Sequence, residues 1–167
     1  MEYDMYDQVI YNEIKKQMDS NATYHFGHKI NIMVLSDRLM GCFNGLCEYL
    51  RQYDDIIVMK VQSLKESEKI CSKAAPDIFI IVGYLANKNL YNILKTVKRA
   101  NPYACTLIYA MLDECITTIK FHYRIEFAFS RHDPMTDFIG FLKEIYTQRL
   151  IDKRNGVKMI SVEDIPI

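Results

Sequence analysis

The stretch Pro76-Asp77-Ile78-Phe79-Ile80-Ile81-Val82-Gly83 decides how the rest of the chain is organised. Proline and aspartate end the preceding segment, five apolar residues follow without a polar break, and a glycine closes the run. An apolar run of this length, rich in isoleucine and valine, is typical of a strand buried on both faces. Such a strand needs neighbouring strands on each side and helices above and below, so the flanking sequence should alternate between the two.

Length and composition limit the class of protein. The chain has 167 residues, which suits one domain of ordinary size with some extra, and 50% of them are hydrophobic, enough for a core. The formal net charge is +0, so the chain is not expected to hold nucleic acid by charge alone. The five cysteines form an odd set without the spacing of a disulfide framework, which predicts reduced thiols.

The ends and the hydropathy of the chain point to a cytoplasmic protein. The N-terminus is acidic and rich in tyrosine, unlike the basic and then apolar sequence of a signal peptide. No apolar run approaches the roughly 18–20 residues that span a bilayer. We therefore expect no membrane association.

Residues 1–28 stand apart and are predicted to form an amphipathic helix followed by a linker. Apolar side chains recur at helical spacing, with charged side chains between them, at Tyr6, Val9, Ile10, Ile14 and Met18. A single helix with one apolar face must cover something. Its polar face is of mixed charge, which favours packing on its own chain or on a dimer partner over a membrane surface.

Outward from the central run, strands alternate with helices. The predicted strands span residues 30–35, 56–61, 78–82, 106–111 and 127–129. The predicted helices span residues 39–52, 63–74, 87–100, 114–123 and 133–150. Alternation with short connections favours parallel strands joined by right-handed crossovers. We therefore predict an α/β domain over residues 29–150: a three-layer αβα sandwich around a five-stranded parallel sheet of order 2-1-3-4-5.

Local signals predict several element ends. Ser63 and Glu66 have the spacing of a capping box, which indicates a helix start. Asp133 and Pro134 suit the N-cap and the first helical position of the last helix. Asn155-Gly156 is typical of a hairpin turn, and a strand is expected directly after it.

These segments, from about residue 29 to residue 148, resemble the receiver domain of bacterial response regulators. The resemblance implies a CheY-like, flavodoxin-like fold whose site lies at the carboxyl ends of strands one, three and four. It rests on features that follow the family pattern in order and without a gap: Pro76-Asp77 before the apolar strand, Asn89, Ile93-Leu94-Lys95, Asn101-Pro102, and Asp133-Pro134 before the last helix.

The resemblance also implies a phosphorylation site, with five positions that carry the chemistry. In the family, an acidic pair helps to hold Mg²⁺, an aspartate ending strand three accepts the phosphoryl group, and a hydroxyl and a lysine bind its oxygens. Here the acidic pair falls on Ser36-Asp37, the phosphoacceptor on Val82 and the hydroxyl on Ala110. The lysine position falls on Ser130, or on Arg131 if the register shifts by one. Val82 has no nucleophilic oxygen, so an aspartyl phosphate cannot form there.

The expected pocket is therefore degenerate, and we expect no metal and no cofactor. Asp37 alone is a weak candidate for a magnesium ligand, because a hard cation prefers several oxygens. The resulting hypothesis is a phosphorylation-independent receiver-like module for regulation and dimerisation, not an enzyme, forming the N-terminal part of a two-component transcription regulator.

Two alternatives remain open. One is a true phosphoacceptor receiver that uses another carboxylate, Asp37 or Asp113. The other is a small flavodoxin-like ligand-binding protein or enzyme, although the chain has no glycine-rich phosphate loop.

The resemblance implies a homodimer, and two surfaces are candidates for its contacts. One is the exit of helix 114–123, with Thr118, Phe121, His122 and Tyr123, although Phe121 and Tyr123 are equally suited to the core. The other is the apolar face of the N-terminal helix, with Tyr6, Ile10 and Ile14.

Residues 151–167 are expected to be a linker or the start of a further domain. The part from Lys153 to Ile165 resembles the opening of a LytTR-type DNA-binding domain. This resemblance implies that the natural protein continues beyond Ile167 and contacts DNA through that domain. The alternative is an ordinary C-terminal strand or a loose tail.

Overall fold

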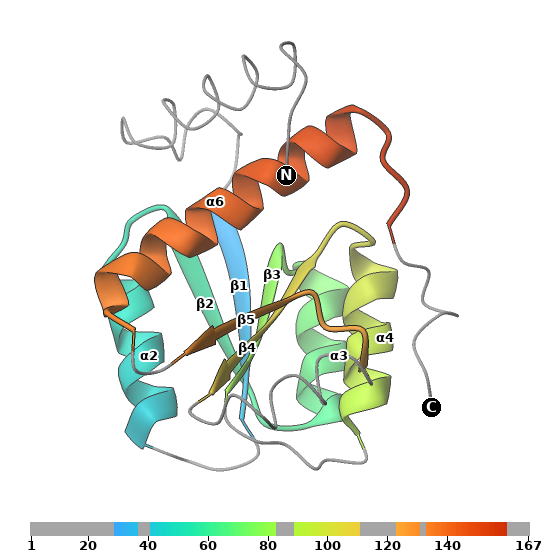
Figure 1. Ribbon diagram of the computed structural model, residues 1–167. Helices are drawn as coiled ribbons and strands as arrows, with labels where there is room; N and C mark the ends of the chain where they lie inside the picture. Colours follow the sequence, from blue (N-terminus) through green and yellow to red (C-terminus); the bar gives the residue numbers. More distant parts are fainter. Residues whose placement is uncertain (1–28, 37–40, 83–88, 111–122, 131–132, 160–167) are drawn as a thin grey trace, which may run out of the picture.

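A computed structural model describes residues 29–36, 41–82, 89–110, 123–130 and 133–159 (Figure 1). Its five strands are β1 (Ile30–Leu35), β2 (Ile56–Val61), β3 (Ile78–Val82), β4 (Cys105–Ala110) and β5 (Phe127–Ser130). The helices in the described ranges are α2 (Gly41–Arg51), α3 (Leu64–Lys73), α4 (Leu90–Ala100) and α6 (Met135–Arg154). The expected alternation is thus confirmed wherever the chain is described.

The strands form one sheet of order β2-β1-β3-β4-β5, and every pairing is parallel. This is the predicted order, with β3 in the middle. All five residues of β3 are buried, since the strand is covered on both faces. The apolar run that decided the prediction is therefore the centre of the core.

The sheet has a hydrophobic cluster on each face, and the helices that cover the two faces make up the outer layers of a three-layer molecule (Figure 1). Ile78, Ile80 and Val82 of β3 point to one face, where α2 and α6 supply Phe43, Leu46, Phe138, Leu142 and other apolar side chains. Phe79 and Ile81 point to the other face, where α4 contributes Leu90, Ile93, Leu94 and Val97 and α3 adds partly buried side chains. Alternate residues of β3 thus serve opposite layers, as the period of a strand requires.

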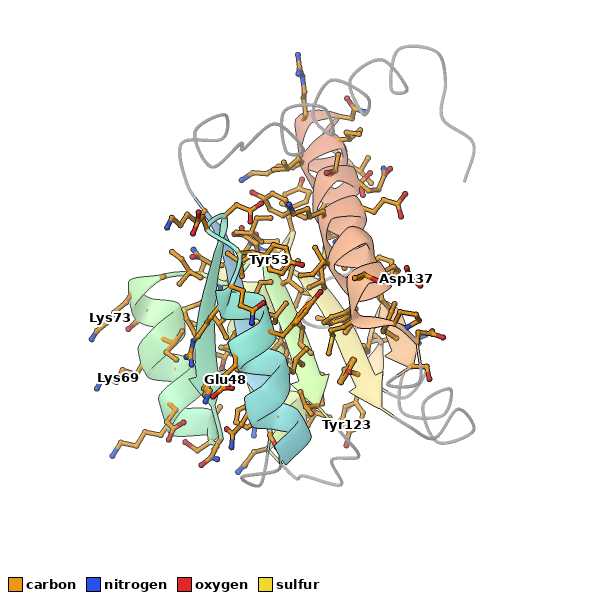
Figure 2. All side chains as sticks on the ribbon, turned by 90° about the vertical axis from the view of Figure 1, so that its left-hand side faces the viewer. Glu48, Tyr53, Lys69, Lys73, Tyr123 and Asp137 are labelled. Atoms are coloured by element: carbon orange, nitrogen blue, oxygen red, sulfur yellow. The ribbon has the colours of Figure 1, made fainter. Side chains whose placement is uncertain are left out.

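The start of α3 follows the predicted capping signal. Ser63 is its N-cap, and the Ser63 hydroxyl oxygen accepts a hydrogen bond of 3.1 Å from the Glu66 backbone N–H. The Glu66 carboxylate accepts in turn from the backbone N–H of Gln62 at 2.8 Å, one residue before the cap. On the outer side of this helix, Lys69 and Lys73 project into solvent (Figure 2).

The start of α6 differs from the prediction. The helix begins at Met135, and Pro134, not Asp133, occupies the N-cap position. Pro134 has an extended backbone (φ −57°, ψ 140°), and its carbonyl accepts from the backbone N–H groups of Asp137 and Phe138. No side chain caps this end. The proline therefore precedes the first turn and does not form part of it.

The end of α6 also corrects the prediction, because Asn155-Gly156 terminates the helix and does not form a hairpin. The helix continues past residue 150 to Arg154, and Gly156 has φ +68°. The Val157 N–H donates to the Asp152 carbonyl at 2.9 Å, and the Gly156 N–H donates to the Lys153 carbonyl at 3.2 Å. This pair of bonds is a Schellman motif. Residues 157–159 form no strand.

Three expectations concern residues outside the described ranges: the N-terminal helix within residues 1–28, the helix over residues 114–123 up to residue 122, and the continuation after residue 159. Among the described helices, none has the length and apolar character needed to cross a membrane.

Candidate functional site

The four described positions of the expected pocket lie at the same edge of the sheet. Leu35 pairs with Ile81, so Ser36 follows at the level of Val82. Val82 pairs with Tyr109, and the next residue of β4, Ala110, pairs with Ser130 of β5. Because all strands are parallel, these residues mark one carboxyl edge. Asp37 and Arg131 lie outside the described residues.

Val82 ends the central strand as a core side chain. It is 1% exposed and belongs to the cluster under α2 and α6, together with Val34 and Tyr109. Full burial of a valine side chain contributes about 1.5–3 kcal/mol to stability. The side chain offers no lone pair, so it can neither attack a phosphoryl group nor ligate a cation.

Ser36 is the second described group at this edge. It is fully buried, and its backbone N–H donates to the Val61 carbonyl at 3.2 Å. A neutral hydroxyl lacks the charge that a carboxylate would give to a magnesium site. Within the described ranges, no group of three or more histidine, cysteine, aspartate or glutamate side chains could hold a metal ion.

An aromatic cluster fills the core between β4, β5 and α6, directly beside Val82. Tyr109 stacks on Phe129 with ring centroids 6.4 Å apart and meets Phe138 at 5.1 Å. Phe129 also contacts Phe138 at 4.8 Å and Phe141 at 5.6 Å. Phe127 of β5 packs edge-on against Phe141 at 5.9 Å. On this face, Val82 therefore shares the core cluster with Tyr109, whose ring belongs to a partly buried aromatic cluster.

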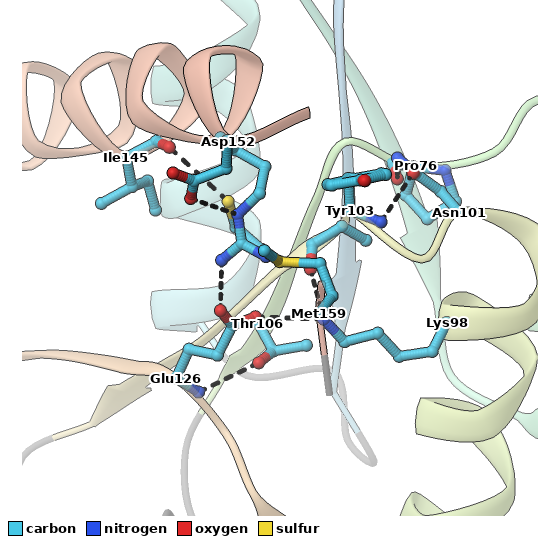
Figure 3. A network of polar contacts seen from close by, with 12 residues as sticks. Pro76, Lys98, Asn101, Tyr103, Thr106, Glu126, Ile145, Asp152 and Met159 are labelled. Carbon is cyan, nitrogen blue, oxygen red and sulfur yellow. Dashed lines mark hydrogen bonds and ion pairs between the residues drawn. The ribbon is translucent and has the colours of Figure 1, made fainter. Parts of the chain in front are cut away.

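A buried charge network lies at the opposite, amino edge of the sheet (Figure 3). The Lys98 ammonium donates to the Ala104 carbonyl at 2.7 Å and to the Glu126 carboxylate at 3.1 Å. Arg149 of α6 pairs with the other oxygen of Glu126, and the Glu126 N–H donates to the Thr106 hydroxyl at 3.0 Å. The network ties α4, β4, the segment before β5 and α6 together.

Sequence reasoning missed this network, although one signal was present. Lys98 follows Leu94 at i+4, and Arg149 follows Ile145 at i+4, so each basic residue continues the buried stripe of its helix. A charge at an inward position predicts a buried partner. The partner itself, Glu126, could not be found without the fold.

A small pocket opens beside the network. Its volume is about 60 Å³, which leaves room for a few water molecules, and it is lined by Asp77, Asn101, Tyr103, Tyr146, Arg149, Leu150 and Lys153. The Asp77 carboxylate accepts from the Asn31 N–H, and Arg149 is paired with Glu126, so the principal charges already have partners. We assign this edge a structural role.

Of the candidate dimer residues, only Tyr123 is described. It is half-buried and packs against the cluster under α3 and α4, which is the core placement weighed for it. The other candidates lie outside the described residues: Tyr6, Ile10, Ile14, Thr118, Phe121 and His122, as does Asp113.

The strand order, the parallel register and the helices on both faces define the CheY-like fold of response-regulator receiver domains. Solved structures share it. A CheY-like receiver domain protein from Methanospirillum hungatei JF-1 superposes with a TM-score of 0.56 at 9% identity, covering 73% of this chain and 97% of that one. The signal receiver domain of an HD domain-containing protein from Pseudomonas fluorescens Pf-5 gives 0.59 at 9% identity, covering 74% and 98%.

A third similar solved structure is described as an enzyme. The structure described as adenylate cyclase from Rhodopirellula baltica superposes with a TM-score of 0.57 at 14% identity, covering 77% of this chain and 93% of that one. No protein-family model and no curated protein matches the sequence. At these identities the likeness shows the fold alone, and on that point the resemblance seen in the sequence is confirmed.

Proposed function

We propose that this chain is a phosphorylation-independent, receiver-like module for regulation and dimerisation, and the N-terminal part of a two-component transcription regulator. The receiver-like fold supports the class of module. Val82, which ends the central strand, supports a mode of action without phosphorylation, because no aspartyl phosphate can form at a valine.

The packing of Val82 carries the proposal. The strand end where a receiver would present its carboxylate holds a hydrocarbon side chain that is 1% exposed, joined to the core cluster and paired with Tyr109. Ser36, fully buried, replaces one of the two acidic residues. An output that cannot depend on an aspartyl phosphate at this strand end must depend on contacts with another protein, a second copy or a small ligand.

Phosphoryl-group mimics test the proposal directly. The chain is incubated with acetyl phosphate and Mg²⁺, or with beryllofluoride and Mg²⁺, and followed by intact mass and thermal shift. We expect neither a mass increase nor a change in Tm, whereas a receiver that retains its aspartate should respond in parallel. Stoichiometric modification would contradict the proposal.

The same assay distinguishes the phosphoacceptor alternative. If modification occurs, Asp37→Ala and Asp113→Ala are compared with the exposed control Asp133→Ala. Loss of labelling in one of the first two variants alone would identify the accepting carboxylate. Retention in all three would place the label elsewhere.

The remaining parts of the proposal concern partners and location. The module acts as a homodimer in the cytoplasm, where Cys47, Cys71 and Cys105, all of them free thiols, stay reduced. DNA contact belongs to a domain that follows residue 167. Light scattering across a concentration series tests the dimer, and a mobility-shift assay with the extended natural chain tests DNA binding; a monomer throughout, or no shift, would contradict them.

A further inference from the structure

The outward face of α6 changes character halfway along the helix. At 3.6 residues per turn, Asp137, Gly140, Glu144, Thr147 and Ile151 form one stripe, opposite the stripe that packs on the sheet through Leu142 and Ile145. The first three residues of the outward stripe are exposed, and Asp137 lies on the side away from the sheet (Figure 2). Thr147 and Ile151, in contrast, are 2% and 1% exposed.

Ile151 is the decisive residue of this stripe. It points away from the sheet, is almost completely buried, and belongs to neither hydrophobic cluster of the described core. An isoleucine can lose its exposed surface at such a position only if a further segment covers it. Next to it, the Gln148 side-chain oxygen is buried and has no hydrogen-bond partner among the described residues, so the covering segment should also bring a donor.

The position of the last two turns of α6 narrows the choice of segment. They lie over the amino edge of the sheet, where Arg149 and Leu150 line the pocket with Asp77. Residues 37–40, 83–88, 111–122 and 131–132 follow β1, β3, β4 and β5, so they start at the carboxyl edge. The tail after α6 runs along the other side of the helix, because the Met159 sulfur lies 2.7 Å from the guanidinium of Arg149, which is on the sheet-facing stripe.

The N-terminal segment remains, and the chain enters the sheet at the right place for it. The Ile30 N–H donates to the Asp55 carbonyl at 2.9 Å, and the Asp55 carboxylate pairs with Lys143 of α6 at 3.0 Å. The start of β1 is therefore near α6, one turn before Thr147. Residues 19–28 can span at most roughly 33–36 Å, more than the length of about 30 Å that 20 residues give α6, so the chain can lead back over the helix.

We propose that residues 6–18 dock as an amphipathic helix on the outward face of the last two turns of α6, with their apolar stripe over Thr147 and Ile151. The apolar side chains of residues 6–18 suit the buried surface around Ile151. The lysine and amide side chains between them can donate the hydrogen bond that the Gln148 side-chain oxygen lacks. The contact places the N-terminal segment on the helix that leads into the C-terminal tail. A signal that displaced it would expose Ile151 and free that end of α6.

Hydrogen exchange of the full chain tests the docking. We expect backbone amides within residues 6–18 to be protected, and Ile151→Asp to accelerate their exchange at least about tenfold. Gly140→Asp is the matched control, because it places the same charge on the exposed half of the stripe, where nothing lies within 4 Å of an added Cβ. Peptides of β3 must stay protected in both variants. Fast exchange in the unmodified chain, or unchanged protection in Ile151→Asp, would overturn the proposal.

A second variant covers the case in which Ile151→Asp also loses protection in β3. Ile151→Cys is labelled with a thiol reagent and read by peptide mass, with Ile10→Asp or Asp7→Asn added in turn. Labelling should be slow, at least about tenfold faster with Ile10→Asp, and unchanged with Asp7→Asn. Equal rates in the three proteins would overturn the proposal.

The occupant is assigned to the same chain, and dilution tests that assignment. Exchange is measured at concentrations at which light scattering shows a monomer. Protection of residues 6–18 in the monomer supports docking within one chain. Protection that disappears together with a dimer would overturn it in favour of exchange of the segment between two copies.

Discussion

Asp77 and Asn31 hold each other by two reciprocal hydrogen bonds at the amino edge of the sheet. The Asp77 N–H donates to the Asn31 carbonyl, and the Asp77 carboxylate accepts from the Asn31 N–H, each at 2.8 Å. The Asp77 carbonyl also accepts from the Cys105 N–H at 2.9 Å, so this residue links β1 to β4 through the start of β3. The carboxylate that precedes the central strand thus aligns strands and is far from the carboxyl edge.

Removing the Asp77 carboxylate should therefore lower stability without affecting the receiver-like site at the carboxyl edge of the sheet, around Val82. Asp77→Ala leaves the Asn31 N–H without its acceptor, and we expect the free energy of unfolding in urea to fall by about 1–3 kcal/mol. Asp77→Asn keeps an acceptor oxygen and should cost less. Asp54→Ala, at an exposed aspartate, should change stability by less than about 0.5 kcal/mol. Equal losses for alanine and asparagine at position 77 would contradict this account.

Restoring a carboxylate at position 82 should be strongly destabilising. Val82→Asp buries a charge in an apolar cluster, and we expect the free energy of unfolding to fall by about 3 kcal/mol or more at pH 7. Burial would raise the pKa of the new carboxyl above its unfolded value, so the penalty relative to the unmodified chain should be smaller at pH 4.

Two control variants separate the effect of the buried charge in Val82→Asp from the effects of lost packing and of an exposed charge. Val82→Ala should cost roughly 2 kcal/mol, because it removes apolar surface and leaves a cavity without adding charge. Ile57→Asp, at a side chain that is 43% exposed on β2, should cost about 1 kcal/mol or less. A Val82→Asp chain as stable as the Ile57→Asp chain would show that the strand end is open and not packed.

Neutralising Glu126 should unbalance the buried charge network. Its carboxylate accepts from both Lys98 and Arg149, whose side chains are only 6% and 9% exposed. Glu126→Gln removes the carboxylate partner of Lys98 and leaves Arg149, among the described residues, with only the longer Asp152 ion pair of 3.9 Å, and we expect a loss of about 3 kcal/mol in chemical denaturation. The exposed control Glu68→Gln should stay within about 0.5 kcal/mol of the unmodified chain. A loss at Glu126 no larger than at Glu68 would mean that the network is solvated.

Alkaline pH should unfold the chain in part through Cys105. Burial raises the pKa of this thiol from 9.0 to about 12, with a smaller opposing effect of Arg149. A group whose pKa is raised by folding contributes stability that is complete below the unfolded pKa and is lost as pH rises toward the folded one. The contribution of Cys105 to stability should therefore be constant up to about pH 9 and be lost between about pH 9 and pH 12.

Replacement of the thiol checks this assignment. Cys105→Ala should flatten the decline by on the order of 1 kcal/mol at pH 10, measured as the difference from the unmodified chain at each pH. Tyr146 contributes in the same direction, since burial also raises its pKa, so some decline should remain. An identical pH profile for Cys105→Ala would contradict the assignment.

Much of the candidate pocket was predictable because it depends on where strands end. The residue at each strand end follows from the run of apolar side chains before it, so Ser36, Val82, Ala110 and Ser130 could be placed at one edge from the sequence. The packing of Val82 against Tyr109 could not, because it depends on which strands pair and in what register.

The sequence by itself determined the periodic elements and the first turn of α3, since both follow from side-chain spacing within a few residues, as with Ser63 and Glu66. Only the tertiary structure decided what Asn155-Gly156 does, because a glycine with φ +68° serves a helix end as well as a hairpin. It also brought Glu126 to Lys98 and Arg149, residues distant in sequence, because a buried charge finds its partner only when the sheet and helices are assembled.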